Sequence, residues 1–156
     1  MKKIIFLLTG LLFFVGCVQL EKKGNEDNDI SAEVRQALNN YFEDIRKNGL
    51  SAEFNWLDSS ADFFWVPPSF RSALTYDSVR NILKHNAKAN RSVDLKWQTL
   101  KIIPLEEKLA IYTGTVQATT IDTSGISNTV YMIETGTVVR RKDGWKLLCG
   151  QTAVME

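Results

Sequence analysis

The sequence has few of the residues that most often build reactive centres. Its 156 residues include two cysteines and one histidine. This scarcity excludes a histidine-rich zinc site, an HExxH metalloprotease motif and a CxxC redox pair. A glycine-rich phosphate loop and a G-x-S-x-G nucleophile elbow are also absent. We therefore expect neither a metal nor an organic cofactor.

An excess of charge of one sign is also missing. Lysine and arginine number 19 against 18 acidic residues, which gives a net charge of +1. Without a basic excess, the composition does not favour a nucleic-acid partner. Hydrophobic residues make up 44% of the chain, which is ordinary for a globular protein, and the length favours one domain.

Long apolar runs are absent too, with one informative exception at the N-terminus. Residues 4–16 are uncharged and mostly Leu, Ile, Phe and Val, and Lys2 and Lys3 precede them. As a helix this run would cover about 20 Å, short of the roughly 30 Å hydrocarbon core of a bilayer. A basic start followed by a short apolar region is typical of a secretory signal.

The apolar run ends at Gly16 followed by Cys17, and this end resembles a bacterial lipoprotein lipobox. The resemblance implies that residues 1–16 are a signal peptide and that Cys17 is acylated and becomes the new N-terminus. The partner would then be a membrane, and the location the bacterial cell envelope. A plain signal peptide with an incidental cysteine is the alternative. Several acyl chains satisfy the requirement for stable membrane anchoring.

The residues after Cys17 predict a tether and then one domain. Residues 18–29 are polar, charged or small, with too few apolar side chains to bury. We predict a flexible tether over residues 17–29 and a folded domain over residues 30–156. If Cys17 is lipidated, Cys149 is the remaining thiol and has no intramolecular disulfide partner.

Apolar spacing predicts helices in the first half of the domain. Within residues 31–48 apolar residues recur at steps of three and four, at Val34, Leu38, Tyr41, Phe42 and Ile45. Residues 50–57 predict a short second helix, and residues 77–90 a third with Thr75 or Asp77 as its N-cap.

The second half predicts strands. Residues 62–66 favour a short strand that ends at two prolines. Four further β-rich runs cover residues 94–104, 108–121, 126–141 and 144–155, joined by short turns that indicate antiparallel hairpins. Helices ahead of such a meander predict an α+β domain in which the N-terminal helices pack on a curved antiparallel sheet.

The third long run is apolar in both phases. Tyr131 and Ile133 alternate with Val130 and Met132, so neither face of that strand is clearly polar. A sheet with one solvated face alternates more cleanly. We therefore expect the outer face to be partly covered, by a second subunit in a homodimer.

Two segments resemble the NTF2-like superfamily, in its SnoaL-like and DUF4440-like branches. Residues 143–153, with the Gly144–Trp145 pair, look like the closing strand, and residues 57–67 look like the aspartate–aromatic strand and proline turn. The resemblance covers residues 31–155 and implies a cystatin-like α+β cone with a ligand pocket at its open end. Gln151 stands where the branch often has a histidine.

Carboxylates and tyrosines are the candidate catalytic residues, because burial in an apolar cup raises a carboxyl pKa toward neutrality. Asp62 precedes Phe63, Phe64 and Trp65, and Glu134 interrupts an apolar strand. Solvation of Asp62 and cross-strand pairing of Glu134 are the alternatives. Tyr41, Tyr112 and Tyr131 could donate to a substrate, or could be core or interface residues.

Polar and aromatic residues are the candidate pocket lining. Asn86 and Asn90 continue the apolar stripe of residues 77–90, and they face either a pocket or the backbone at the helix end. The full candidate set for the pocket is Asp62, Tyr112 and Glu134 as catalytic residues, with Tyr41, Trp65, Asn86, Tyr131 and Gln151 as lining.

These observations predict a membrane-tethered lipoprotein whose cone binds a small apolar or amphipathic ligand. One alternative is an isomerase or hydro-lyase of the SnoaL or ketosteroid-isomerase kind, with Asp62 or Glu134 as the base. The other alternative is a non-catalytic interaction subunit that uses the outer face of the sheet. The sequence identifies no ligand and leaves the question of catalysis open.

Overall fold

The computed structural model describes the backbone of residues 9–155 and the side chains of residue 24 and residues 26–155. The predicted signal peptide lies partly outside the described backbone, and the side chain of Cys17 lies outside the described residues. Within the described part, no helix is long and apolar enough to cross a membrane.

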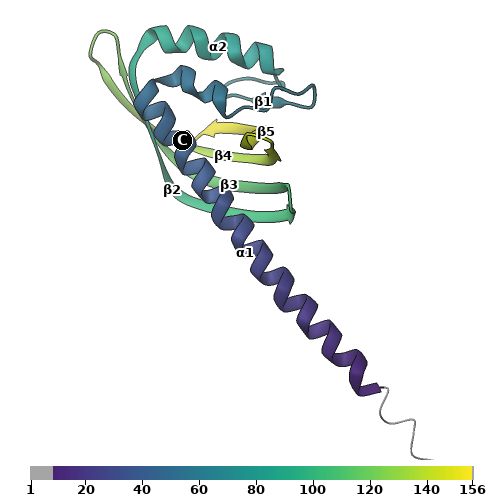
Figure 1. Ribbon diagram of the computed structural model, residues 1–156. Coiled ribbons are helices and arrows are strands. Elements are labelled where there is room, and N and C mark those ends of the chain that lie inside the picture. The colour runs from purple at the N-terminus through teal and green to yellow at the C-terminus, as the bar shows by residue number, and fades with distance from the viewer. Residues whose placement is uncertain (1–8, 156) are drawn as a thin grey trace, which may run out of the picture.

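A long first helix positions the domain. Helix α1 (Thr9–Asn48) presents an apolar stripe to the sheet, which includes Val34, Leu38 and Ile45, as the spacing predicts. Gly49 follows the helix with a φ of 82°, a conformation that glycine adopts without strain. The helix begins well before residue 31, so the segment predicted as a tether is helical here. Figure 1 shows this N-terminal half projecting beyond the sheet.

Two shorter helical elements follow. The segment predicted as a short helix is the 3₁₀ helix η1 (Leu50–Asn55). Helix α2 (Tyr76–Ala89) begins after Thr75, whose hydroxyl accepts a hydrogen bond from the backbone N–H of Ser78. Of the two predicted N-caps, Thr75 is therefore the one used.

One five-stranded sheet forms the rest of the domain. Its order is β1-β5-β4-β3-β2, with β1 parallel to β5 and the other pairs antiparallel. The predicted four-strand meander and the additional short strand are both confirmed. The strands are β1 (Phe64–Val66), β2 (Asn90–Glu106), β3 (Leu109–Asp122), β4 (Ser127–Arg141) and β5 (Gly144–Val154).

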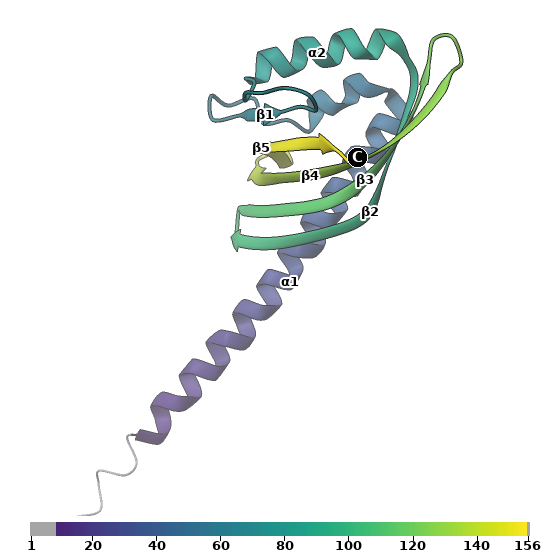
Figure 2. The ribbon, with the colours of Figure 1, turned by 180° about the vertical axis from the view of Figure 1, so that it is seen from behind.

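The sheet has one face covered by helices and one that is not. The inner face packs against α1, and a cluster of buried side chains from both layers forms the core. In Figure 1, α1 runs in front of the strands, and Figure 2 shows β2, β3 and β4 from the opposite side, with no helix over them. We call this second side the outer face.

Candidate functional site

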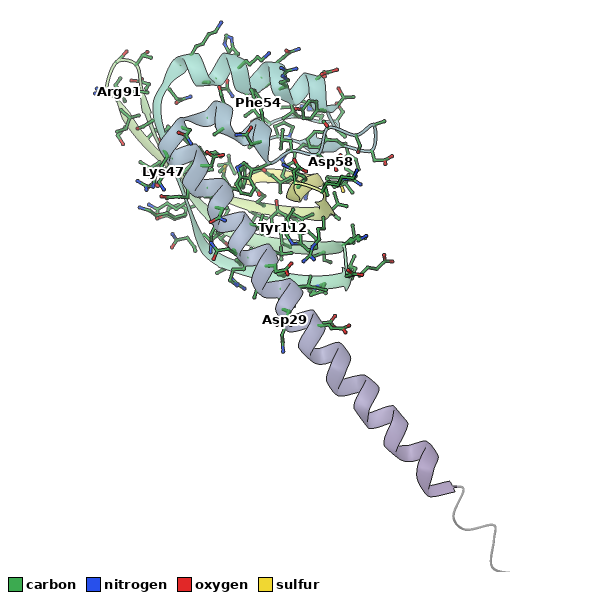
Figure 3. All side chains as sticks on the ribbon, viewed as in Figure 1. Asp29, Lys47, Phe54, Asp58, Arg91 and Tyr112 are labelled. Carbon is green, nitrogen blue, oxygen red and sulfur yellow. The ribbon has the colours of Figure 1, made fainter. Side chains whose placement is uncertain are left out.

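A buried carboxyl lies at the centre of the inner face. Glu134 on β4 is 7% exposed and lies between Gly114 on β3 and Thr152 on β5. The hydroxyl of Tyr112 donates a hydrogen bond to Oε1 of Glu134 at 2.7 Å. The hydroxyl of Thr152 donates to Oε2 at 3.4 Å, and it accepts a bond from the indole N–H of Trp65 at 3.1 Å. Four elements thus meet at one carboxyl, and Figure 3 labels Tyr112 among the strands behind α1.

Among the described residues, no lysine, arginine or histidine side chain forms an ion pair with this carboxyl. Burial raises the pKa of Glu134 from 4.5 to about 7, although the hydrogen bonds from Tyr112 and Thr152 act in the opposite direction. A carboxyl of this kind exchanges its proton near neutral pH, which is what general acid–base chemistry requires.

A second carboxyl faces the first from the helical layer. The pKa of Glu53 on η1 is raised from 4.5 to about 8, by burial first and by the negative charge of Glu134 second, although the hydrogen bond from the Tyr41 hydroxyl acts in the opposite direction. The pKa values of Tyr41 and Tyr112 are also raised, by burial first and by the neighbouring carboxyls second. Because each carboxyl opposes ionisation of the other, the pair titrates as a coupled unit.

Aromatic rings lie directly on glycines around this cluster. A Cβ atom added at Gly136 would lie 2.9 Å from the Tyr112 ring, and one added at Gly150 would lie 2.7 Å from the Trp65 ring. Side chains at these positions would displace the rings that donate toward Glu134 and Thr152. The three ring and glycine pairs are Tyr112 with Gly136, Trp65 with Gly150 and Trp97 with Gly114.

The structure brings four of the predicted site residues together and leaves four elsewhere. Tyr41, Tyr112, Glu134 and Trp65 meet inside the cone. The others are exposed: Asp62 ahead of β1, Asn86 on α2, and Tyr131 and Gln151 on the outer face. The carbonyl of Asn86 accepts a hydrogen bond from the Asn90 side chain, so this pair closes the helix end.

Two members of the cluster, Glu53 and Thr152, were not among the predicted site residues. A 3₁₀ helix has three residues per turn, so it aligns Glu53 with Leu50, whereas α-helical spacing aligns Leu50 with Phe54. On β5, a bulge at Leu148 changes the alternation, since Cys149 pairs with Thr137 and Leu147 with Val138. The bulge places Thr152 inside.

Two cavities open at the surface of the domain, and the second of them shares Tyr112 with this cluster. One has a volume of about 580 Å³ and is polar, with Asp58, Ser60, Tyr76, Arg141 and Lys146 in its lining. The other, which we call the outer groove, has a volume of about 380 Å³ and crosses the outer face. Among the described residues, no group of three His, Cys, Asp or Glu side chains is placed to hold a metal ion.

Comparison with known proteins places the fold. The sequence matches no protein-family model and no curated protein. Solved structures do match, and three of them are a candidate scytalone dehydratase from Novosphingobium aromaticivorans, an NTF2-like superfamily protein from Salmonella enterica serovar Typhimurium, and a cystatin-like protein from Caulobacter vibrioides.

The first of these has a TM-score of 0.74 and 14% identity over 85% of this chain and 89% of its own. The second has a TM-score of 0.69 and 14% identity, over 83% and 93%. The third has a TM-score of 0.63 and 13% identity, over 81% and 89%. At such low identity the likeness concerns the fold alone. Together with the helices on a curved open sheet, it shows that the chain has the NTF2-like, cystatin-like fold.

Proposed function

We propose that the protein is a lipid-anchored protein of the bacterial cell envelope whose NTF2-like cone binds a small apolar or amphipathic molecule. The observation that supports binding is the uncompensated carboxyl of Glu134, which hydrogen-bonds to Tyr112 within an apolar core. An apolar core gains nothing from a carboxyl without a cation, because its burial costs free energy. A ligand with one hydrogen-bonding oxygen would bind this carboxyl and account for its burial.

The two oxygens of Glu134 differ in what they can offer a ligand. Oε1 is held by Tyr112 at 2.7 Å, and beyond Tyr112 the ring of Trp97 stacks on Phe42, so that side is filled. Oε2 has the longer bond of 3.4 Å to Thr152. We therefore expect the ligand to lie on the side of Thr152 and Trp65 and to bind Oε2.

Binding can be tested with 4-fluorophenol, a small aromatic probe with one hydroxyl. The full chain in lipid nanodiscs is titrated with the probe and followed by ¹⁹F NMR, with empty nanodiscs as the baseline. We expect Glu134→Gln to weaken binding about tenfold, the size of one charge-assisted hydrogen bond. Asp62→Asn removes an exposed carboxyl and should bind as the wild type does. Equal binding by Glu134→Gln, or no wild-type signal above empty nanodiscs, would reject the proposal.

The lipid anchor has its own test. Cells that express the full chain are fed an alkyne-tagged palmitate, and the label on the protein is measured. Cys17→Ser should lose the label and leave the membrane fraction, while Cys149→Ser should keep both. Label that persists in Cys17→Ser would contradict anchoring at this residue.

Proton transfer is the second candidate function. A pKa of about 7 suits Glu134 to remove a proton from carbon next to a carbonyl, with a tyrosine hydroxyl as donor to the oxygen. This is the chemistry of an isomerase or a hydro-lyase, and two structural neighbours carry dehydratase names. Of the two carboxylates predicted as bases, Glu134 is buried and Asp62 is exposed.

The catalytic alternative is tested by exchange of the α-hydrogens of cyclohexanone in D₂O, followed by NMR. Activity that falls at least a hundredfold in Glu134→Gln would support it, the usual size of general-base catalysis. Asp62→Asn should exchange as fast as the wild type. Equal rates with and without the protein would leave ligand binding as the function.

A further inference from the structure

The polar cavity beside Asp58 has no part in the ligand site proposed for the cone. Its volume of about 580 Å³ falls in the range of small-molecule sites. It shares no lining residue with the outer groove or with the cluster around Glu134. Its walls come from η1, residues 57–60, the start of α2 and the β4–β5 hairpin, and Figure 3 labels two lining residues, Phe54 and Asp58.

In this cavity the guanidinium of Arg141 is fixed on one side and free on the other. Its Nε–H donates to Oδ2 of Asp58, and its side chain makes no other hydrogen bond to a described residue. Asp58 is 4% exposed and also accepts a bond from the backbone N–H of Ser60, so it is a firm anchor. The Arg141 side chain is 43% exposed. The N–H groups of its two Nη atoms therefore remain available as a planar fork, which fits a carboxylate.

Other donors in the lining also lack acceptors. The ammonium of Lys146 donates to the carbonyl of Asn55 and pairs with Asp143, which leaves one of its three N–H groups. The hydroxyl of Ser60 is buried and has no hydrogen-bond partner within the described part of the chain, although buried hydroxyls ordinarily have one. Each oxygen of Asp58 already accepts a bond. A ligand with an anionic pair of oxygens would supply the missing acceptors.

The same cavity has aromatic walls. Phe54 and Tyr76 line it together with Leu57. Neighbouring side chains hold both rings, because the Arg80 guanidinium lies 6.0 Å from the centre of the Phe54 ring and the Phe63 ring contacts Tyr76 edge to face at 5.8 Å. Rings that are already held lose little freedom when a ligand packs on them. The cavity therefore suits the apolar body of a ligand as well as its charged end.

We infer that this cavity binds a small aromatic monocarboxylate, with its carboxylate on the Nη atoms of Arg141 and its ring against Phe54 and Tyr76. A single negative charge fits best, because Asp58 and Asp143 also line the cavity and would repel a doubly charged phosphate more strongly. The cone has the opposite preference, since the charge of Glu134 would repel an anion there. The cavity is therefore a second site, with a ligand class of its own.

The inference is tested with 4-fluorobenzoate, followed by ¹⁹F NMR on the full chain in lipid nanodiscs, with empty nanodiscs as the baseline. A titration up to about 10 mM covers the affinity expected of so small a ligand. We expect saturable binding of the benzoate and at least about tenfold weaker binding of 4-fluorobenzamide, which has the same ring and no charge. Equal binding of the amide, or no benzoate signal above empty nanodiscs, would overturn the inference.

Two neighbouring arginines allow a matched comparison. Arg141→Lys keeps a cation beside Asp58 but lacks the planar fork, so it should bind the benzoate about tenfold more weakly. Arg140→Lys is the control, because Arg140 pairs with Glu33 and lies over the Trp145 ring, outside the cavity lining. It should bind as the wild type does. Equal affinity of the two variants would show that the Arg141 fork does not hold the ligand.

A further variant protects the test against misfolding. Lys146→Met keeps an unbranched apolar side chain and removes the ammonium, so it should weaken benzoate binding about threefold. If Arg141→Lys alters the circular dichroism spectrum, Lys146→Met decides the question, and an unchanged affinity would overturn the inference. Glu134→Gln should bind the benzoate as the wild type does, whether or not the cone binds its own ligand. A loss of benzoate binding in Glu134→Gln would locate the anion in the cone and reject the second site.

Discussion

Two buried carboxyls in this domain have opposite surroundings. Asp58 is 4% exposed and Glu134 is 7% exposed. Asp58, labelled in Figure 3, accepts hydrogen bonds from the guanidinium of Arg141 and from the backbone N–H of Ser60. Glu134 accepts hydrogen bonds from two neutral hydroxyls.

The hydrogen-bond partners of each carboxyl determine whether it is ionised. Burial raises the pKa of Asp58, but the hydrogen bonds from Arg141 and Ser60 outweigh it and the net shift is downward. Burial dominates at Glu134, and its pKa is raised. An ionised, paired carboxyl that anchors a loop is a structural device. A carboxyl kept near neutrality without a cation is the pattern found at functional sites.

The largest expected difference between Glu134 and Asp58 is in how each changes the stability of the fold with pH. The pKa of Glu134 rises on folding from 4.5 to about 7, so the folded state binds the extra proton. Its contribution is complete below pH 4.5 and is lost as pH rises through 7, by about 3 kcal/mol. Glu53, with a pKa of about 8, steepens the fall.

Asp58 has the opposite sign, since its contribution is lost as pH falls below its ordinary value of 3.8. Stability should therefore be greatest between pH 3.8 and pH 4.5, measured by denaturant unfolding of the full chain at a series of pH values. Glu134→Gln should flatten the alkaline side and leave the acid side unchanged. A profile that rises steadily from pH 5 to 8 would contradict the raised pKa values.

Gly136→Ala should disrupt the hydrogen bond between Tyr112 and Glu134. The added Cβ would lie 2.9 Å from the Tyr112 ring and 3.0 Å from its hydroxyl, so the ring must move away from Glu134. We expect a loss of about 2 kcal/mol in the free energy of unfolding, the usual cost of overpacking. Gly24→Ala is the control, because a Cβ at this helical glycine meets nothing within 4 Å. It should be neutral or slightly stabilising.

Substitution by the amide should affect the two carboxyls unequally at pH 7. Asp58→Asn removes the charge that Arg141 pairs with and should cost about 1.5 kcal/mol, moderated because the Arg141 side chain is 43% exposed. Glu134→Gln removes a carboxyl whose burial already disfavours folding at pH 7, so it should be neutral or stabilising. Chemical denaturation of both variants checks the order, and equal losses would remove the distinction.

Tyr112→Phe tests how much one neutral hydroxyl contributes to the pKa of Glu134. The Tyr112 hydroxyl stabilises the ionised form of Glu134, so its loss should raise the pKa of Glu134 by about one unit, equivalent to ~1.4 kcal/mol. A ¹³C NMR titration of the glutamate carboxyls measures this directly. Tyr131→Phe removes a hydroxyl from the outer face and should leave that titration unchanged.

The periodicity of apolar residues predicted most of the fold, because each helix and strand buries one face. The stripe of α1, the N-cap Thr75 and the four-strand meander follow from apolar spacing and turn residues. The start of α1 was not predictable in this way. Residues 17–29 have no apolar stripe, and a helix rich in Lys and Glu can form without one.

The candidate site was predictable where alternation is regular and not where it breaks. Glu134 and Tyr112 lie in regular stretches of β4 and β3, and both face inward. On β5, alternation from Trp145 and Leu147 would bring Gln151 inside, but one extra residue at the Leu148 bulge turns Gln151 outward and Thr152 inward. A single sequence shows no sign of where such a bulge falls.

The glycines beneath the aromatic rings give the sheet a further property. Gly136 and Gly150 line the outer groove, while Tyr112 and Trp65 rest on the inner side of the same two residues. The groove and the rings therefore share a wall that is one peptide thick. Pressure on the groove from outside would shift that wall and, with it, the hydroxyl and the indole nearest to Glu134. A molecule bound on one face of the sheet should therefore shift the residues that line the other face.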